Sequence, residues 1–326
     1  MIMTRALALL ALGLLAFAAP AAAQDKYPTK PIRLIVPFAV GGGTDIPARL
    51  LSARMGEFLG QQIIIDNRPG AGGNLGTDLA AKSPPDGYTI LLGSISSFAI
   101  NPGLYKKMPY DPIKDFEPIG LAAIGPISLN VHHSVPATDL KGLIALIKAN
   151  PGKYSFGSSG MGSILHLCGE SFKTMAGGLE MEHVPYRGSG PMMIDLSAGQ
   201  IPIAFDGMPT TLPQVQAGTI RAIAMGTQKR ASAMPDLPTL HELGMTGFQC
   251  HFWTTFFAPA KTPKPIITIL LDALNKTLAD PVIARRMQEL GFEITPDTSP
   301  EKLAAFLKSE IAFWGPVIKA SGASLD

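Results

Sequence analysis

The sequence predicts an α/β protein with two lobes, in which two mixed or parallel sheets are flanked by helices and a cleft separates the lobes. Short apolar runs alternate with amphipathic helical stretches along the chain, which is typical of parallel sheets with crossover helices. Two glycine-rich loops, one in each half of the chain, come directly after an apolar run and directly before a helical stretch. Because ligands of such sheets bind at the loops that follow the strands, one such loop in each lobe would face a shared cleft.

The expected strands and helices follow from the apolar runs, their period and their end signals. Strands are expected at residues 32–36, 62–66, 88–93, 154–157, 201–206 and 220–225. Helices are expected at residues 46–59, 140–148, 164–175, 263–278 and from 300 onward. Asp139 is expected to cap the helix that follows it. In the last helix, five apolar side chains should share one face: Leu303, Leu307, Ile311, Trp314 and Ile318.

The composition favours a folded protein that does not bind nucleic acid. Of the 326 residues, 46% are hydrophobic and only 16% are charged, which excludes a charged, disordered chain. The 27 basic and 25 acidic residues give a net charge of +2, so no basic excess is available to bind a phosphate backbone. The 34 glycines and 29 prolines are spread along the chain and indicate many loops between short elements.

The first segment, residues 1–23, is predicted to be a signal peptide. Arg5 supplies the positive charge, residues 6–19 form an uncharged apolar stretch, and Ala21, Ala22 and Ala23 suit a cleavage site. The alternative, a membrane anchor, is disfavoured because this stretch is shorter than the roughly 20 residues that a spanning helix needs. We therefore expect a soluble protein that is exported to the periplasm.

The two glycine-rich loops are the first candidates for a binding site. They span residues 37–45 and 157–163, each at a predicted helix start. The N–H groups at a helix start are unpaired and carry a partial positive charge, so they can bind a carboxylate or phosphate without a basic side chain. The alternative is a tight strand-to-helix turn without a ligand. The candidate residues are Gly41, Gly42, Gly43, Thr44, Ser158, Ser159, Gly160, Gly162 and Ser163.

Two acidic residues near these loops each have two possible roles. Asp45 could stabilise the start of its helix, or it could orient the loop or accept a ligand ammonium group. Asp206 lies at the end of a predicted strand, before Gly207, and could accept a ligand N–H or hydroxyl group or cap the next helix.

The sequence contains no recognisable catalytic or cofactor motif. Phosphate-loop, nucleophile-elbow, dinucleotide and zincin patterns are all interrupted, and the six histidines are not spaced as metal ligands. We therefore expect no catalytic residue, no metal and no cofactor, although His166 could in principle act as a base for Ser159 or Ser163. Cys168 and Cys250 could form a disulfide in an exported protein or remain as buried thiols.

A series of ordered motifs resembles one protein family over essentially the whole chain after residue 23. The matching runs are Tyr27 to Arg33, Val36-Pro37-Phe38, Gly41-Gly42, Thr44-Asp45, Ala48-Arg49, Asn67 to Gly73, Asp86 to Thr89, Asn101-Pro102, Tyr110-Asp111-Pro112, Ser158-Ser159-Gly160, Gly162-Ser163, Val184-Pro185-Tyr186, Gly199-Gln200, Ala258-Pro259 and Ile318 to Gly322. On these motifs the chain resembles the Bug family of periplasmic solute-binding proteins, the TctC-like receptors of tripartite tricarboxylate transporters.

The resemblance implies a two-lobed periplasmic-binding fold of the type II kind that closes over its ligand. It implies lobe 1 at residues 24–125 plus 250–326 and lobe 2 at residues 126–249, with hinges near 123–126 and 250–253. It also implies that Phe38 joins the first loop in holding one end of the ligand, that the second loop holds a carboxylate, and that the stretch from Ser94 to Ser97 and Asp206 line the cleft. Two departures, Val40 for a frequent proline and Gly207 for a typical asparagine, alter the expected ligand contacts.

The function that the resemblance implies is capture of a small organic carboxylate and its delivery to a membrane permease. The ligand could be a di- or tricarboxylate, an acidic amino acid or an aromatic acid, and we expect the protein to act as a monomer. A ligand sensor for a membrane signalling protein, built on the same fold, is one alternative. A hydrolase that uses Ser159 and His166 is the other.

Overall fold

The computed structural model describes residues 27–321 and 324–325, and the predicted signal peptide lies outside these residues. The strands are β1 (Ile32–Val36), β2 (Ile63–Asn67), β3 (Thr89–Gly93), β4 (Phe116–His132), β5 (Tyr154–Ser158), β6 (Met181–Pro185), β7 (Ile203–Gly207), β8 (Ile220–Met225), β9 (His251–Pro259) and β10 (Glu293–Ile294). The helices are α2 (Asp45–Leu59), α3 (Asn74–Ala81), α4 (Asn101–Leu104), α5 (Leu140–Lys148), α6 (Ile164–Met175), α7 (Ser189–Ser197), α8 (Met208–Gln216), α9 (Lys264–Ala279), α10 (Pro281–Glu289) and α11 (Pro300–Ser321), with short helical segments η2 (Ala71–Gly73) and η3 (Ser96–Ile100).

The strands form two mixed sheets that share β4. In the first sheet β1 is parallel to β2 and β3, and β9 joins β3 to β4 through antiparallel pairs. In the second sheet β5 is parallel to β6 and β7, and β4 pairs antiparallel with β7 and β8. Each sheet therefore combines a parallel part with an antiparallel edge toward the other sheet, which confirms the predicted α/β class with two lobes.

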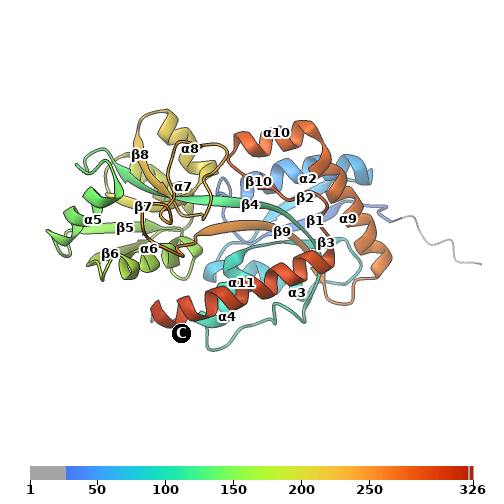
Figure 1. The fold of residues 1–326 in the computed structure, drawn as a ribbon. Coiled ribbons are helices and arrows are strands. Elements are labelled where there is room, and N and C mark those ends of the chain that lie inside the picture. The colour runs from blue at the N-terminus through green and yellow to red at the C-terminus, as the bar shows by residue number, and fades with distance from the viewer. Residues whose placement is uncertain (1–26, 322–323, 326) are drawn as a thin grey trace, which may run out of the picture.

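Strand β4 passes from one sheet to the other near its middle. Its first part, up to Pro126, pairs with β9, and from Ile127 onward it pairs with β7 and β8. Figure 1 shows β4 and β9 running between the group of α5 to α8 and the group of α2, α9 and α10. The assignment of residues 24–125, 126–249 and 250–326 to lobes stays a prediction.

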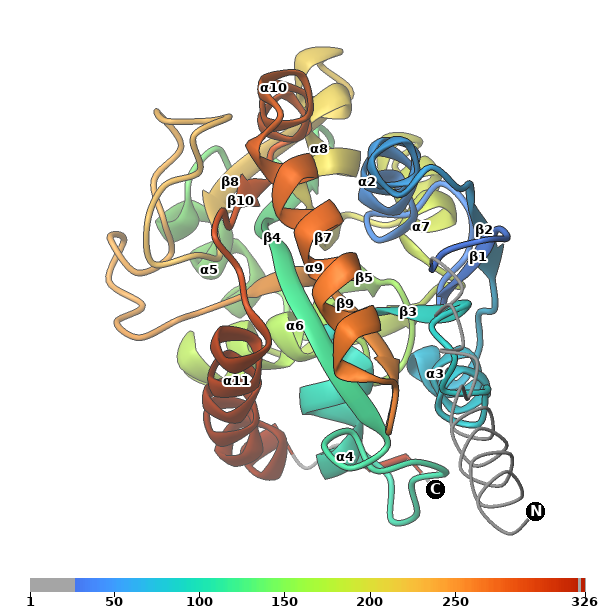
Figure 2. The same cartoon turned by 90° about the vertical axis from the view of Figure 1, so that its right-hand side faces the viewer.

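The local signals in the sequence set most of these element bounds. The carboxylate of Asp139 accepts the N–H of Gly142 at 2.7 Å, so the predicted cap of α5 is confirmed. In α11 the predicted apolar face is buried at Leu303, Leu307, Trp314 and Ile318, while Ile311 is partly buried. Figure 2 shows α11 beside the long strands and α9 lying along β4.

Two large apolar cores hold most helices against the sheets, and a small third cluster joins α8 to β8. One lies between the first sheet and α2, α9 and α10, and includes the buried side chains of Leu34, Leu51 and Leu270. The larger core continues from the first lobe to the second and includes Phe98, Phe156 and Trp253. Because this core is continuous, the two lobes share packed apolar contacts at the β4–β9 connection.

The two cysteines, which the sequence allowed to be paired or free, form a disulfide. Cys168 lies in α6 and Cys250 immediately precedes β9, and their Cα atoms are 5.8 Å apart. The bond therefore ties a helix of the second sheet to the start of a strand that leads back to the first sheet.

Residues 27–321 and 324–325 contain neither a membrane-spanning helix nor a cluster of metal-binding side chains. No helix there is both long enough and apolar enough to cross a lipid bilayer. Within the same part of the chain, no three His, Cys, Asp or Glu side chains are grouped so that they could hold a metal ion.

Loss of the disulfide should lower the free energy of unfolding. The bond joins residues 82 positions apart, and closing a loop of that length in the unfolded chain corresponds to about 4 kcal/mol in the chain-entropy account. Urea unfolding of the double variant Cys168→Ala/Cys250→Ala should show this loss, and a reducing agent should destabilise the natural protein but not the variant. Equal stability of the two proteins would contradict the pairing.

Candidate ligand-binding cleft

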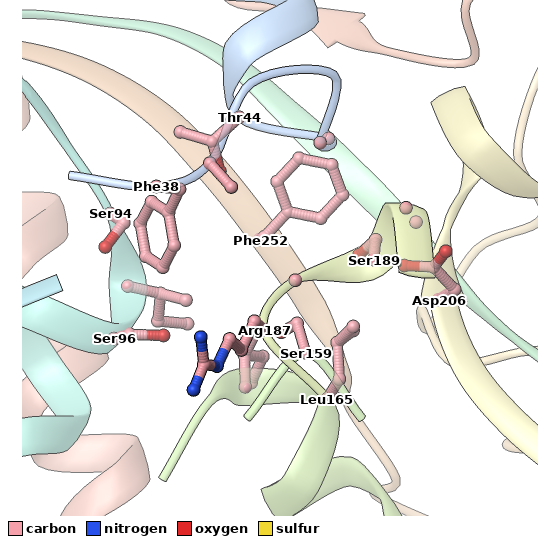
Figure 3. A pocket seen from close by; sticks show the side chains of 18 of the residues that line it. Phe38, Thr44, Ser94, Ser96, Ser159, Leu165, Arg187, Ser189, Asp206 and Phe252 are labelled. Carbon is pink, nitrogen blue, oxygen red and sulfur yellow. Dashed lines mark hydrogen bonds between the residues drawn. The ribbon is translucent and has the colours of Figure 1, made fainter. Parts of the chain in front are cut away.

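A cleft lies at the carboxyl ends of the parallel strands of both sheets. Most segments that line it follow β1, β3, β5 and β6 or form the end of β7, as expected for ligand sites in α/β sheets, and β9 adds Phe252 and Trp253. The lining residues are Phe38, Ala39, Val40, Gly42, Gly43, Thr44, Ser94, Ile95, Ser96, Ser159, Ile164, Leu165, Arg187, Gly188, Ser189, Gly190, Pro191, Asp206, Gly207, Phe252 and Trp253. Residues from both halves of the chain therefore face one shared space (Figure 3).

The first glycine-rich loop presents unpaired donors to this cleft. The backbone N–H groups of Gly42, Gly43 and Thr44 have no acceptor among residues 27–321 and 324–325, and neither does the hydroxyl of Thr44. These groups precede the first turn of α2, where the helix dipole adds a partial positive charge. The loop therefore offers several donors to an anion.

Asp45 orients this loop from behind and does not line the cleft. Its carboxylate accepts the N–H of Gly41 at 2.9 Å, an amide N–H of Asn67 at 2.9 Å and the guanidinium of Arg49 at 2.8 Å. Burial would raise the pKa of Asp45, but the hydrogen bonds from Arg49, Gly41 and Asn67 outweigh burial and hold the pKa below its ordinary value. Since Arg49 neutralises this carboxylate, Asp45 does not repel an anion at the loop.

The second glycine-rich loop uses most of its donors internally. The N–H of Gly160 donates to the hydroxyl of Ser158, the N–H of Gly162 donates to Nδ1 of His166, and the hydroxyl of Ser163 accepts the N–H of His166. Of the predicted residues in this loop, Ser159 alone lines the cleft, and its hydroxyl has no partner within the described part of the chain. The loop therefore contributes only the hydroxyl and the backbone N–H of Ser159, which likewise has no acceptor within the described residues.

His166 is not arranged as a general base for a serine. Nδ1 accepts the N–H of Gly162 at 3.2 Å, and the ring stacks on His183 with 4.0 Å between the ring centroids. Burial lowers the pKa of His166 below its ordinary value. Burial, with smaller effects from His166 and Lys173, lowers the pKa of His183 to about 3. Both rings are therefore neutral, and the pair packs behind the loop.

The segment after β3 contributes serine hydroxyl groups. Ser94 lines the cleft, and its hydroxyl forms a 3.0 Å hydrogen bond with the hydroxyl of Ser97, which is fully buried behind it. Ser96, from the same expected stretch, lines the cleft with a hydroxyl that has no partner among the residues described.

Arg187, which is not among the predicted site residues, is the one cation among the residues that line the cleft. It follows β6 and precedes Gly188, Ser189 and Gly190 at the start of α7. Arg187 is exposed and has no ion-pair partner within residues 27–321 and 324–325. The sequence does contain a pattern that could have indicated Arg187, because a strand, a glycine–serine loop and a helix follow one another here as they do at the two predicted loops.

Asp206 is a buried carboxylate with no cationic partner in the part of the chain that the structure describes. It accepts the hydroxyl groups of Ser189 at 2.7 Å and Thr210 at 2.6 Å, near the starts of α7 and α8. Burial raises the pKa of Asp206 to about 6, although hydrogen bonds from Thr210, Ser189 and the N–H of Gly207 partly offset that rise. The helix starts stabilise its negative charge.

The structure separates the fourteen predicted site residues into two equal groups. Seven line the cleft: Phe38, Gly42, Gly43, Thr44, Ser94, Ser159 and Asp206. Seven do not, and they hold the lining segments from behind or bond within the loops: Gly41, Asp45, Ser97, Ser158, Gly160, Gly162 and Ser163.

Comparison with known proteins shows a match over most of the chain. The family model described as "Tripartite tricarboxylate transporter family receptor" matches residues 47–323. Protein BugT of Bordetella pertussis is 36% identical over 327 residues, which cover 99% of each chain.

Solved structures of similar proteins share the fold. The periplasmic binding protein BugD has a TM-score of 0.87 at 37% identity and covers 91% of this chain and 99% of its own. A Rhodopseudomonas palustris protein solved with malate has a TM-score of 0.85 at 31% identity, and the match covers 90% of this chain and 100% of that protein. R. palustris Rpa4515, solved with adipate, has a TM-score of 0.86 at 39% identity, and the match covers 92% of this chain and 100% of that protein.

Replacing Asp206 should flatten part of the pH dependence of stability. Its pKa in the folded protein is about 6, above the 3.8 of an unperturbed aspartate, so the folded form binds the proton more tightly. The contribution to stability is therefore present at low pH and is lost as the pH rises through 6. Between pH 4.5 and 7.5, the natural protein should lose about 2 kcal/mol more unfolding free energy than Asp206→Asn. If urea unfolding shows the same loss of unfolding free energy in the natural protein and in Asp206→Asn, the pKa of Asp206 is not raised.

Proposed function

This chain belongs to the tripartite tricarboxylate transporter receptor family, and we propose that it binds an organic carboxylate in the cleft between its two lobes. Receptors of this family are periplasmic binding proteins, and the solved relatives include one with adipate and one with malate. The observation that carries the proposal is the convergence of unpaired donors from both halves of the chain on one cleft.

The donors divide between the two lobes. The backbone N–H groups of residues 42–44 come from the first lobe, and Arg187 and the hydroxyl of Ser159 come from the second. A carboxylate can accept several such hydrogen bonds at once, and charge-assisted bonds to a guanidinium are stronger than neutral ones. A ligand that touches both sets of donors would favour the closed arrangement, because its affinity for that arrangement is greater.

We infer that the protein delivers its ligand to a membrane permease and does not transform it. The hydrogen bond that Nδ1 of His166 accepts from the N–H of Gly162 supports this, because it occupies the nitrogen that would take a proton from Ser159 or Ser163. We further propose that the chain reaches the periplasm through cleavage of residues 1–23 and acts there as a monomer.

Arg187→Gln should weaken carboxylate binding. A hydrogen bond to a charged group contributes about 1.5–3 kcal/mol, so the affinity should fall roughly tenfold or more. Titration calorimetry with adipate, malate and benzoate would measure the loss, and each acid should be recovered chemically unchanged.

Arg285→Gln is the matched control, since Arg285 lies on α10 and does not line the cleft. It should bind each acid as the natural protein does. The proposal fails if none of the three acids, nor any member of a wider carboxylate panel, binds to the natural protein. It also fails in its assignment of Arg187 if both variants bind equally well.

A further inference from the structure

The ring of Phe252 occupies a niche formed by three glycines at the junction of the two sheets. Phe252 is paired with Gly125 across β9 and β4, and a Cβ atom at Gly125 would overlap the ring. A Cβ atom at Gly207 would lie 2.5 Å from Cε1 of the ring, and one at Gly43 would lie 3.5 Å from Cζ. The ring therefore contacts the first loop, the crossing strand and the end of β7 together, and a larger residue at Gly125 or Gly207 would displace it.

The position of this ring is fixed by its surroundings rather than by a ligand. Phe292 packs against it edge to face, with 5.6 Å between the ring centroids and 83° between the planes. The ring is only partly buried, and its remaining surface lines the cleft. A rigid apolar surface that is already in place loses little entropy when a ligand packs on it.

A second aromatic ring, that of Phe38, lines the cleft from the first lobe. Phe38 is partly buried, and a Cβ atom at Gly73 would lie 3.2 Å from its Cζ, so the ring is packed closely from behind. In Figure 3 the two rings lie between Thr44 on one side and Arg187 on the other. Apolar side chains of Ile95, Ile164 and Leu165 complete the wall.

From this arrangement we propose that the ligand is an aromatic carboxylate, whose ring packs against Phe252 and Phe38 while its carboxylate is bound by the donors at Arg187 or at the first loop. The proposal rests on the proposed function and specifies the body of the ligand. Phe252 and Phe38 are specificity-determining residues, because they contact the part of the ligand that distinguishes an aromatic acid from an aliphatic acid of equal charge.

The aromatic preference should be measurable as a ratio of affinities. An aromatic pair adds about 0.5–1.5 kcal/mol beyond the burial of its area, which corresponds to roughly tenfold at its upper end. Terephthalate and adipate form a matched pair, since each carries two carboxylates separated by four carbon atoms along the shortest path. Benzoate and hexanoate form a second pair with one carboxylate each.

Titration calorimetry with these four acids tests the proposal. The natural protein should bind terephthalate or benzoate, or both, roughly tenfold more tightly than the aliphatic partner. Phe252→Leu should remove most of this preference while changing the affinity for the aliphatic acids little, and Phe38→Leu should act in the same direction. Phe58→Leu is the matched control, because Phe58 lies on α2 and is 41% exposed outside the cleft.

The outcomes separate the two proposals. If the aliphatic acids bind as tightly as their aromatic partners, or if Phe252→Leu and Phe38→Leu weaken both members of a pair equally, the aromatic assignment is overturned and carboxylate binding stands. Binding confined to aliphatic acids outside this panel overturns it as well. If no carboxylate binds at all, the proposed function fails and the aromatic assignment fails with it.

Discussion

The asymmetry of charge in the cleft is the constraint on which the rest of the account depends. Arg187 and the unpaired N–H groups of residues 42–44 give an anion several partners, whereas Asp206 already accepts the hydroxyl groups near the starts of α7 and α8. An anionic group is therefore favoured at the first two places and disfavoured at the third. Between them lie apolar side chains, so the cleft suits a ligand with a charged end and an apolar body.

The fold produces this arrangement through the course of two strands. Strand β4 belongs to both sheets, and β9 pairs with its first part, so the carboxyl ends of the parallel strands in each sheet face the same space. Phe252 lies where β9 meets the change of sheet in β4, and the nearby disulfide ties α6 to the start of β9. Movement of one lobe relative to the other would thus change the contacts of Phe252, which lines the cleft.

Sequence patterns predicted the α/β class and the glycine-rich loop that lines the cleft before α2, because these follow from local chemistry, whereas Phe38 and Ser94 were expected only from the resemblance to a family. Period, caps and glycine-rich turns gave the bounds of α5 and α6 and the donor loop before α2. They could not show whether Gly160 and Gly162 use their N–H groups internally, since that depends on Ser158 and His166 in three dimensions. Residue 252 lies within the hinge expected near 250–253, but only the spatial meeting of distant glycines shows how the ring of Phe252 is held.

The most direct test of the central claim is a crystal structure of the protein with the acid that it binds most tightly. The account predicts that a carboxylate of this acid accepts hydrogen bonds from Arg187 or from the N–H groups of Gly42, Gly43 and Thr44, and that the ligand contacts both lobes. A ligand bound to one lobe alone, or a carboxylate placed against Asp206 at neutral pH, would contradict it.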